Sequence, residues 1–379
     1  MELTPFVRAR IVSAGGHDAA QWAEGMWFTF PRALMETSGW LTRLQPSGDL
    51  TLSAADEPIA ADAARAVREH AAFTDRPPVS GRLPFDYQRV PGWGRAAIAS
   101  LVGRWHRGRS AKWAAFPGWP LDLTSDLLSD LTAVPSGGLR GRTPVVLTHD
   151  IDSDEGLRNL HSAFLPIEEA VGARSVSYIV PCAWPIDHAA VEQIVSRGHE
   201  VGVHGYDHSN RTAFADSGER RRRLDAARPF ADRFGAVGYR APSLLRTRVL
   251  LGDLGARYLY DSSIPTSGGL FPVPNNGCAT ARPFSVEGIT EMPLSMPRDG
   301  SLRFLGYPAA AIGRLWTQCA DAIARSRGSV VLLTHCERRF SGNPEMLATY
   351  RRFLEYLAGR PETFEFVGAS ALARAVDAA

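Results

Sequence analysis

The strongest constraint on the fold is a repeated pattern in which an apolar, β-prone run ends in a polar or reactive residue. The pattern recurs between Arg142 and Ser341. Its clearest examples read Val145-Val-Leu-Thr-His-Asp150-Ile-Asp152, Glu200-Val-Gly-Val-His204-Gly-Tyr-Asp-His208, Val237-Gly-Tyr-Arg240-Ala-Pro242, Tyr258-Leu-Tyr-Asp261 and Val330-Val-Leu-Leu-Thr-His335. Because α/β folds build active sites at successive strand ends, the pattern predicts an α/β enzyme.

The sequence pattern changes near Ser136–Gly138. After this point, predicted helices alternate with apolar runs, and these runs are too uniformly apolar for strands of a sheet with one solvent-exposed face. For residues 139–379 we predict a parallel sheet or a barrel of the (β/α) type, because seven or eight βα units fit in about 230 residues. Residues 1–138 mix strand-like pieces with an amphipathic helix at 59–72, so we predict an N-terminal α+β accessory region of unassigned role.

The predicted strands of the barrel end near Thr148, Val180, His204, Arg240, Asp261, Pro293 and His335, with a further one at Phe364–Val367. Helices are predicted at Asp187–Arg197, Ser217–Phe234, Ala309–Arg325 and Pro344–Ala358. In the N-terminal region, a Gly/Pro-rich stretch carries Trp93, Trp105, Trp113 and Trp119. These aromatics fit packing onto a neighbouring domain better than stacking on sugar rings.

Charge and cysteine content limit the partners. The 379 residues carry a net charge of +2, and Lys112 is the only lysine, so we expect no nucleic-acid partner. The basic run Arg220–Arg223 is interpreted as a solvated helix face. The cysteines lack C-x-x-C spacing, and neither a secretory leader nor a membrane-spanning run is apparent. We therefore predict a cytoplasmic protein without a membrane span; the composition is compatible with a homo-oligomer.

The best candidates for chemistry are histidines and carboxylates that follow the apolar runs. His204 and His208 stand four residues apart, and imidazole is the commonest protein ligand of divalent transition metals. Asp150 and Asp152 would repel each other unless a cation or a proton lies between them. One carboxylate with two imidazoles forms a metal site with open positions for water and substrate. The other carboxylate is then available as a general base.

His335 completes such a set, because amide cleavage requires a proton for the leaving nitrogen. Asp261 is placed to orient this histidine and to raise its pKa. Arg240 is placed to pair with the base carboxylate. Taken singly, Arg240 and Asp261 fit a structural ion pair equally well. His149 should point away from Asp150 and is interpreted as a core histidine.

Over roughly Arg142 to Ala379 these residues resemble the polysaccharide deacetylase superfamily, that is, carbohydrate esterase family 4 with the NodB homology fold. The resemblance implies that residues 139–379 form an α/β catalytic domain with a distorted (β/α)7-type barrel. The family motif T-F-D-D-G is similar to Thr148-His-Asp150-Ile-Asp152, which implies Asp150 as base and Asp152 as metal ligand. The motif H-S/T-x-x-H corresponds to His204 through His208, which supply the other ligands. The R-x-P, aspartate and L-x-H motifs correspond to Arg240-Ala-Pro242, Asp261 and Leu333-Thr-His335, with His335 as general acid.

The chain also departs from the family pattern. Ile151 separates the carboxylates, as in the D-x-D branch that is similar to allantoinase-like amidohydrolases. Gly205 replaces a hydroxyl residue, and Ser243 replaces an aromatic residue whose backbone N–H the family uses on the oxyanion, so only the Ser243 N–H carries over. Glu291-Met-Pro293 resembles a strand end of the same branch.

The sequence thus predicts a metal-dependent hydrolase that removes an N-acetyl or other small acyl group from an amino sugar or glycan precursor. One divalent metal ion is expected, Zn²⁺ first, with Co²⁺, Ni²⁺ or Fe²⁺ as alternatives. Hydrolysis of a cyclic amide and a catalytically silent glycan-binding module remain open. The D-x-D spacing alone would also suit a glycosyltransferase or a phosphatase of the haloacid dehalogenase type, but neither needs the histidines.

Overall fold

The computed structural model describes residues 5–13, 18–82, 92–109, 116, 119–132, 141–267 and 277–378. Within these ranges the strands form a three-stranded sheet near the N-terminus and a nine-stranded sheet that begins at Thr143. The predicted boundary at Ser136–Gly138 lies outside the described residues.

The N-terminal region contains β1 (Phe6–Ser13), β2 (Trp27–Pro31), α1 (Arg32–Thr37), β3 (Asp49–Thr51), α2 (Glu57–His70), α3 (Val79–Arg82), α4 (Gly92–Arg109) and α5 (Thr124–Asp130). The strands of the large sheet are β4 (Thr143–Ile151), β5 (Ser175–Ile179), β6 (Glu200–Val203), β7 (Gly238–Tyr239), β8 (Tyr260–Asp261), β9 (Phe284–Val286), β10 (Ile289–Glu291), β11 (Val330–His335) and β12 (Phe364–Phe366). The accompanying helices are α6 (Asp154–Asn159), α7 (Leu165–Glu169), α8 (His188–Ser196), α9 (Ser217–Phe234), α10 (Arg248–Gly255), α11 (Asp299–Phe304), α12 (Ala309–Arg325), α13 (Pro344–Ala358) and α14 (Ala369–Asp377).

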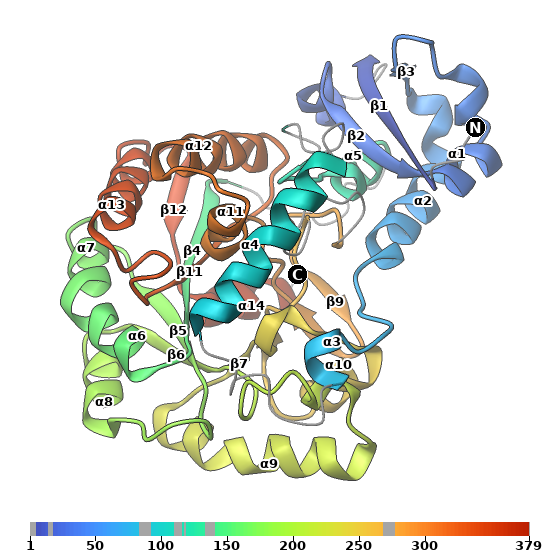
Figure 1. Cartoon of the computed structure of the whole chain (residues 1–379). Coiled ribbons are helices and arrows are strands. Elements are labelled where there is room, and N and C mark those ends of the chain that lie inside the picture. The colour runs from blue at the N-terminus through green and yellow to red at the C-terminus, as the bar shows by residue number, and fades with distance from the viewer. Residues whose placement is uncertain are drawn as a thin grey trace.

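The large sheet curls into an incomplete barrel. Its strand order is β11-β4-β5-β6-β7-β8-β10-β9, with β12 beside the start of β4, and every pair is parallel except β9 with β10. The Met296 N–H donates to the Val331 carbonyl oxygen across 3.1 Å, which links the segment after β10 to β11. Helices α7, α8, α9, α12 and α13 lie around the outside (Figure 1). The predicted α/β barrel class is confirmed.

Burial explains why the central strands are so uniformly apolar. β4 is buried along almost its whole length, as expected for a parallel strand covered on both faces. Its register with β11 places His335 beside Asp150, so the polar residues that follow these strands collect at one edge of the sheet.

Helix boundaries follow capping residues. The predicted bounds of α9, α12 and α13 are the observed ones, and α8 is one residue shorter at each end than predicted. At the start of α9 the Asp216 carboxylate accepts a hydrogen bond from the Glu219 N–H, and Gly235 ends the helix with a φ of 65°. The Asn343 side chain caps α13 in the same way.

Elements of the N-terminal region were harder to predict. Sequence reasoning missed β1, which pairs with both β2 and β3, and α4, whose glycines lower helix propensity. Trp119 is buried against Tyr307, in agreement with a packing role, whereas Trp105 is 57% exposed. The side chains of Trp93 and Trp113 lie outside the described part of the chain.

Buried ion pairs join the two regions. The carboxylates of Asp126 and Asp130, both on α5, lie 3.7 and 2.7 Å from the guanidinium of Arg282, and all three side chains are buried. Arg246 donates to the carbonyl oxygens of Ala71 and Ala72, just past the end of α2. Among the described helices, none is both long enough and apolar enough to cross a bilayer.

Replacing Arg282 by alanine should leave the buried carboxylate of Asp126 without its cation and that of Asp130 with only the partly exposed Arg327. We expect Arg282→Ala to lower the free energy of unfolding by about 3–5 kcal/mol, measured by urea denaturation. Arg142→Ala is the matched control, because Arg142 forms an exposed pair with Glu365, and its cost should be about 0–1 kcal/mol. Equal losses in the two variants would contradict the role assigned to the buried pairs.

Candidate active site

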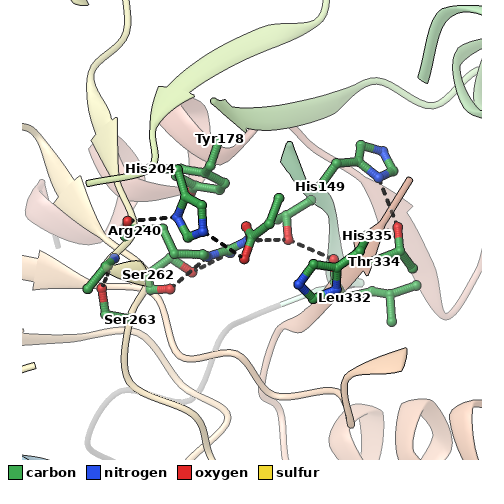
Figure 2. A network of polar contacts seen from close by, with 12 residues as sticks. His149, Tyr178, His204, Arg240, Ser262, Ser263, Leu332, Thr334 and His335 are labelled. Carbon is green, nitrogen blue, oxygen red and sulfur yellow. Dashed lines mark hydrogen bonds and ion pairs between the residues drawn. The ribbon is translucent and has the colours of Figure 1, made fainter. Parts of the chain in front are cut away.

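The ends of β4, β6, β7 and β11 bring the predicted site residues together. Figure 2 shows His204 and Arg240 on one side of the cluster and His335 on the other, with His149 turned away toward Thr334. His149 is fully buried, and its ring nitrogens lie 2.8 Å from the Thr334 hydroxyl and 2.7 Å from a Glu168 carboxylate oxygen. It is therefore a core histidine, as predicted.

Asp152, His204 and His208 converge on one point. Oδ1 of Asp152 lies 3.5 Å from Nε2 of His204 and 3.4 Å from Nε2 of His208. One ligand atom from each of the three residues lies within 4.8 Å of the others. The Asp152 Oδ1 atom is buried and accepts no hydrogen bond from the described residues, so its lone pairs are available to a cation. This donor set fits one divalent metal ion.

Protonation states support that interpretation. The Arg240 carbonyl oxygen lies 3.0 Å from Nδ1 of His204 and can only accept, so Nδ1 carries the hydrogen and Nε2 keeps its lone pair. Burial lowers the pKa of His204, which favours the neutral ring. Burial would raise the pKa of Asp152, but the imidazoles of His208 and His204 lower it to about 2. A neutral imidazole and an ionised carboxylate are the forms that bind metals.

Glycine is required directly after His204. Gly205 has a φ of 68°, and a Cβ at this position would lie 2.4 Å from Cδ of Pro242. The hydroxyl residue of the family pattern is therefore excluded, because the loop that follows Arg240 occupies its space.

The loop between the two histidines is held from outside by α9. Asp207 accepts hydrogen bonds from the Ser209 N–H at 3.0 Å and from Nη1 of Arg223 at 3.2 Å. Our interpretation of Arg220–Arg223 as a solvated face is wrong for its first and last residues, which are buried. Arg220 pairs with Asp253 at 2.6 Å, and Arg223 reaches Asp207 in the loop between His204 and His208.

Arg240 lies beneath Asp150 and is fully buried. Its Nη1 donates to Oδ1 of Asp150 and to the Thr148 hydroxyl, each at 2.9 Å. Nε and Nη2 donate to the carbonyl and hydroxyl oxygens of Ser262, also at 2.9 Å, and the guanidinium lies 4.0 Å from the centre of the Tyr178 ring. The predicted pairing of Arg240 with Asp150 is present, while the role of Asp150 as base stays a prediction.

The carboxylate that holds His335 is Asp299. Its Oδ1 lies 2.8 Å from Nδ1 of His335, and its Oδ2 accepts the His335 backbone N–H and the Ser341 hydroxyl. Burial would lower the pKa of His335, but Asp299, with weaker contributions from Asp150 and Asp152, raises it to about 9. The imidazole is therefore protonated at neutral pH, as a proton donor must be.

Our assignment of Asp261 as the partner of His335 is wrong. Asp261 accepts hydrogen bonds from the Ser263 N–H and hydroxyl, and the Ser263 Oγ accepts the Ala241 N–H at 2.8 Å. Asp261 is also the β8 neighbour of Glu291 on β10, and burial raises the pKa of both carboxyl groups. The physical reason for the error is position: β8 lies beside β7, so Asp261 supports the loop after Arg240.

Ser243 lies in a short turn at Pro242–Leu244 and is exposed. Its φ of 53° and that of Leu244, 55°, are left-handed values that non-glycine residues adopt rarely. The use of its N–H as an oxyanion donor stays a prediction.

Sequence reasoning missed Asp299 and Glu337. Glu337 is buried and accepts the Ser153 hydroxyl at 2.8 Å; burial, with Asp152 adding to it, raises its pKa to about 7. Glu337 stands two residues after His335, just past a strand end, and this position could have identified it as a candidate site residue. Asp299 begins the short helix α11, with no apolar run directly before it, so the strand-end pattern could not find it.

The N-terminal region touches three of the segments that form the site. The Asn210 side chain, two residues after His208, donates to the Ser80 hydroxyl at 3.1 Å. The Arg246 carbonyl, three residues after Ser243, accepts the Thr74 N–H. α4 packs on α11, the helix that begins with Asp299.

Comparisons with known proteins were made at three levels. No protein-family model and no curated protein sequence matches the chain. Among solved structures, it is similar to a protein assigned as a polysaccharide deacetylase from Mycobacterium smegmatis, with 21% identity and a TM-score of 0.51, over 63% of this chain and 91% of that one. PuuE allantoinase (18% identity, TM-score 0.48, 63% of this chain and 91% of that chain) and a protein assigned as a polysaccharide deacetylase from Pseudomonas aeruginosa PAO1 (16%, 0.47, 62% and 90%) also match.

Removal of one imidazole should weaken metal binding strongly. We expect the purified protein to bind about one zinc ion per chain and His204→Ala to bind it more than about 100-fold more weakly, because a ligand is lost. Elemental analysis and calorimetric titration measure both. His188→Ala, which changes an exposed histidine at the start of α8, should bind zinc as the wild type does. A wild-type protein that takes up no divalent metal would rule out the site.

Proposed function

Because the chain has the polysaccharide deacetylase fold, we propose that it is a metal-dependent hydrolase that removes an N-acetyl or other small acyl group from an amino sugar or glycan precursor. One observation carries the proposal. Asp150, which is paired with Arg240, and His335, which is held by Asp299, are neighbours in the register of β4 and β11, and Asp150 lies 3.5 Å from His204 of the His/Asp cluster. A candidate base and a candidate acid therefore lie together at the strand ends that carry the metal-type site.

The base side follows from the contacts of Asp150. A divalent metal ion held by Asp152, His204 and His208 would lower the pKa of a bound water and polarise the acyl oxygen. Arg240 occupies Oδ1 of Asp150 and keeps the carboxylate in place. Oδ2 lies 3.5 Å from Nε2 of His204, close to the cluster, where it can accept the proton of the attacking water.

The acid side follows from Asp299. Because Asp299 holds Nδ1 of His335, Nε2 is the nitrogen left to donate a proton. A protonated His335 delivers that proton to the leaving amine and so avoids expulsion of an amide anion. The N–H of Ser243 is proposed as a donor to the oxyanion that forms on the acyl group.

The alternatives are weakened by the same contacts. A glycosyltransferase or a haloacid dehalogenase-type phosphatase would need the D-x-D carboxylates free for a nucleotide or phosphate group, yet Asp150 is bound to Arg240 and Asp152 faces two imidazoles. A silent glycan-binding module would not need a protonated histidine, His335, next to the Asp150 carboxylate. A cyclic amide would use the same residues, and substrate assays separate it from an N-acetyl sugar.

Zn²⁺ suits two imidazoles and one carboxylate, so it is the metal proposed. The N-terminal region, residues 1–138, is proposed to support the loops of the catalytic domain, residues 139–379. The cytoplasmic location and the oligomeric state stay predictions.

The proposal is tested by acetate release. The zinc-loaded protein should release acetate from N-acetylated amino sugars, and Asp150→Asn should reduce kcat by about 10²–10⁴-fold through loss of the base. Zinc affinity of this variant should change little. Asp154→Asn is the matched control, because Asp154 is exposed and, within the described ranges, its carboxylate pairs with Arg158 on the surface, so its kcat should equal that of the wild type.

The result that would contradict the proposal is a zinc-loaded protein with no acetate release from any amino sugar. Turnover of a cyclic amide under the same conditions would then identify the alternative reaction.

The acid role of His335 predicts a pH dependence. Its pKa is raised to about 9 by Asp299, so the protonated form persists below that pH and is lost as pH rises through it. Wild-type kcat/KM should therefore fall above about pH 9. In Asp299→Asn the alkaline limb should move down toward the ordinary histidine pKa of about 6.5.

Asp299→Glu, which keeps the negative charge, should restore much of the alkaline limb. An alkaline limb that stays in place in Asp299→Asn would show that another group supplies the proton.

A further inference from the structure

The helix α4 exposes an apolar row. Ile98, Leu101 and Trp105 are 63, 71 and 57% exposed. In the part of the chain that the structure describes, the other large hydrophobic residues with such exposure are Ile59, Val195 and Val249, which lie on other elements. The spacing of three and then four residues places the row on one face of the helix.

The opposite face of α4 is the one that packs. Gly103 is buried against α11: a Cβ at this position would lie 3.2 Å from the Phe304 carbonyl oxygen and 3.5 Å from a Leu305 methyl carbon. Position 103 lies about half a turn from the middle of the exposed row, at 100° per residue. Among the described residues, the row therefore lies on the face of α4 opposite the one that packs on α11.

The sequence around this row is strongly basic. Between Asp86 and Asp122 the chain contains no aspartate or glutamate, whereas Arg89, Arg95, Arg104, Arg107, Arg109 and Lys112 all fall in this interval. Arginines elsewhere are balanced: on α9, Arg222 and Arg223 pair with Glu219 of the same helix. Because the whole chain carries a net charge of only +2, positive charge is concentrated in this segment.

An exposed apolar row in an acid-free, arginine-rich helix matches a surface that combines apolar material with negative charge. We propose that α4 docks on an anionic lipid bilayer, lying in the plane of the headgroups with Ile98, Leu101 and Trp105 inserted. Tryptophan favours this interfacial depth, and arginines favour anionic headgroups. A nucleic acid would match the charge but leave Ile98 and Leu101 in water. A second copy of the chain would cover the apolar row but would bring two basic segments together.

The position of α4 relates this surface to the active site. α4 packs on α11, whose first residue, Asp299, holds His335. Figure 1 shows α4 crossing in front of the large sheet. A docked α4 would bring the acid side of the site near the membrane surface, which suits a glycan carried on a lipid. This last step rests on the proposed function, whereas docking itself does not.

Docking is tested with the full chain and without substrate, so that its failure and the failure of the hydrolase proposal are distinguishable. The protein is sedimented with vesicles of phosphatidylglycerol and phosphatidylcholine in equal parts, and with phosphatidylcholine alone. Binding is expected to the anionic vesicles and to weaken in high salt. The triple variant Ile98→Ser/Leu101→Ser/Trp105→Ser should lose about tenfold or more in bound fraction.

The matched control is Val195→Ser/Val249→Ser, which removes exposed apolar side chains of 42 and 57% exposure from other helices and should bind as the wild type does. If the triple variant does not fold, Arg104→Glu, at an exposed position of α4, serves instead and should weaken binding several-fold. The proposal is overturned if the wild type does not sediment with anionic vesicles, if the α4 variant binds as well as the wild type, or if the control loses as much. It is also overturned if the wild type forms dimers that the triple variant abolishes while neither binds vesicles.

Discussion

The ion pair between Arg240 and Asp150 is the interaction on which the rest of the site depends. A fully buried guanidinium is tolerated only when its donors are satisfied, and Arg240 meets this condition through Asp150, Thr148 and Ser262 and through the face of Tyr178. Those partners come from β4, from β5 and from the residue after β8. One side chain therefore fixes the relative positions of several strand ends, and the cluster of Asp152, His204 and His208 lies beside them.

Around this pair, the carboxyl groups differ in charge because their neighbours differ. Asp152 faces imidazoles and is ionised, Asp299 is held ionised by His335, and Glu337 is partly protonated near neutral pH because burial, with Asp152, raises its pKa. Asp261 and Glu291 face each other from neighbouring strands with raised pKa values, which is expected of two buried carboxyl groups that share a proton. Because each carboxyl group has its own neighbours, a site of this kind can hold a cation, a base and an acid close together without transfer of the acid's proton to the base.

Much of the catalytic half could be predicted from the sequence. Parallel strands that are buried on both faces appear in the sequence as long apolar runs, and functional residues lie at the ends of such strands. The barrel and the strand-end positions of Asp152, His204, His208 and Arg240 could therefore be predicted from the local sequence pattern. The partner of His335 could not. Asp261 and Asp299 are both carboxylates after β7, and only the three-dimensional path of the chain decides that β8 lies beside Arg240 while α11 lies against β11. The N-terminal half gave weaker signals, because the glycines of α4 lower its helix propensity and β3 is only three residues long.

The contacts of the N-terminal region bear on how this protein can be divided. Ser80, Thr74 and the carbonyls of Ala71 and Ala72 satisfy polar groups of the loops that carry the site, and among these groups is the buried guanidinium of Arg246. If the barrel were expressed without the N-terminal region, that guanidinium would lose the two carbonyl acceptors, and the segment that follows Ser243 would lose its contact with Thr74. The two halves therefore cannot be exchanged independently of each other. Any natural or engineered relative that replaces the first half must supply equivalent acceptors, so sequence change in one half constrains the loops of the other.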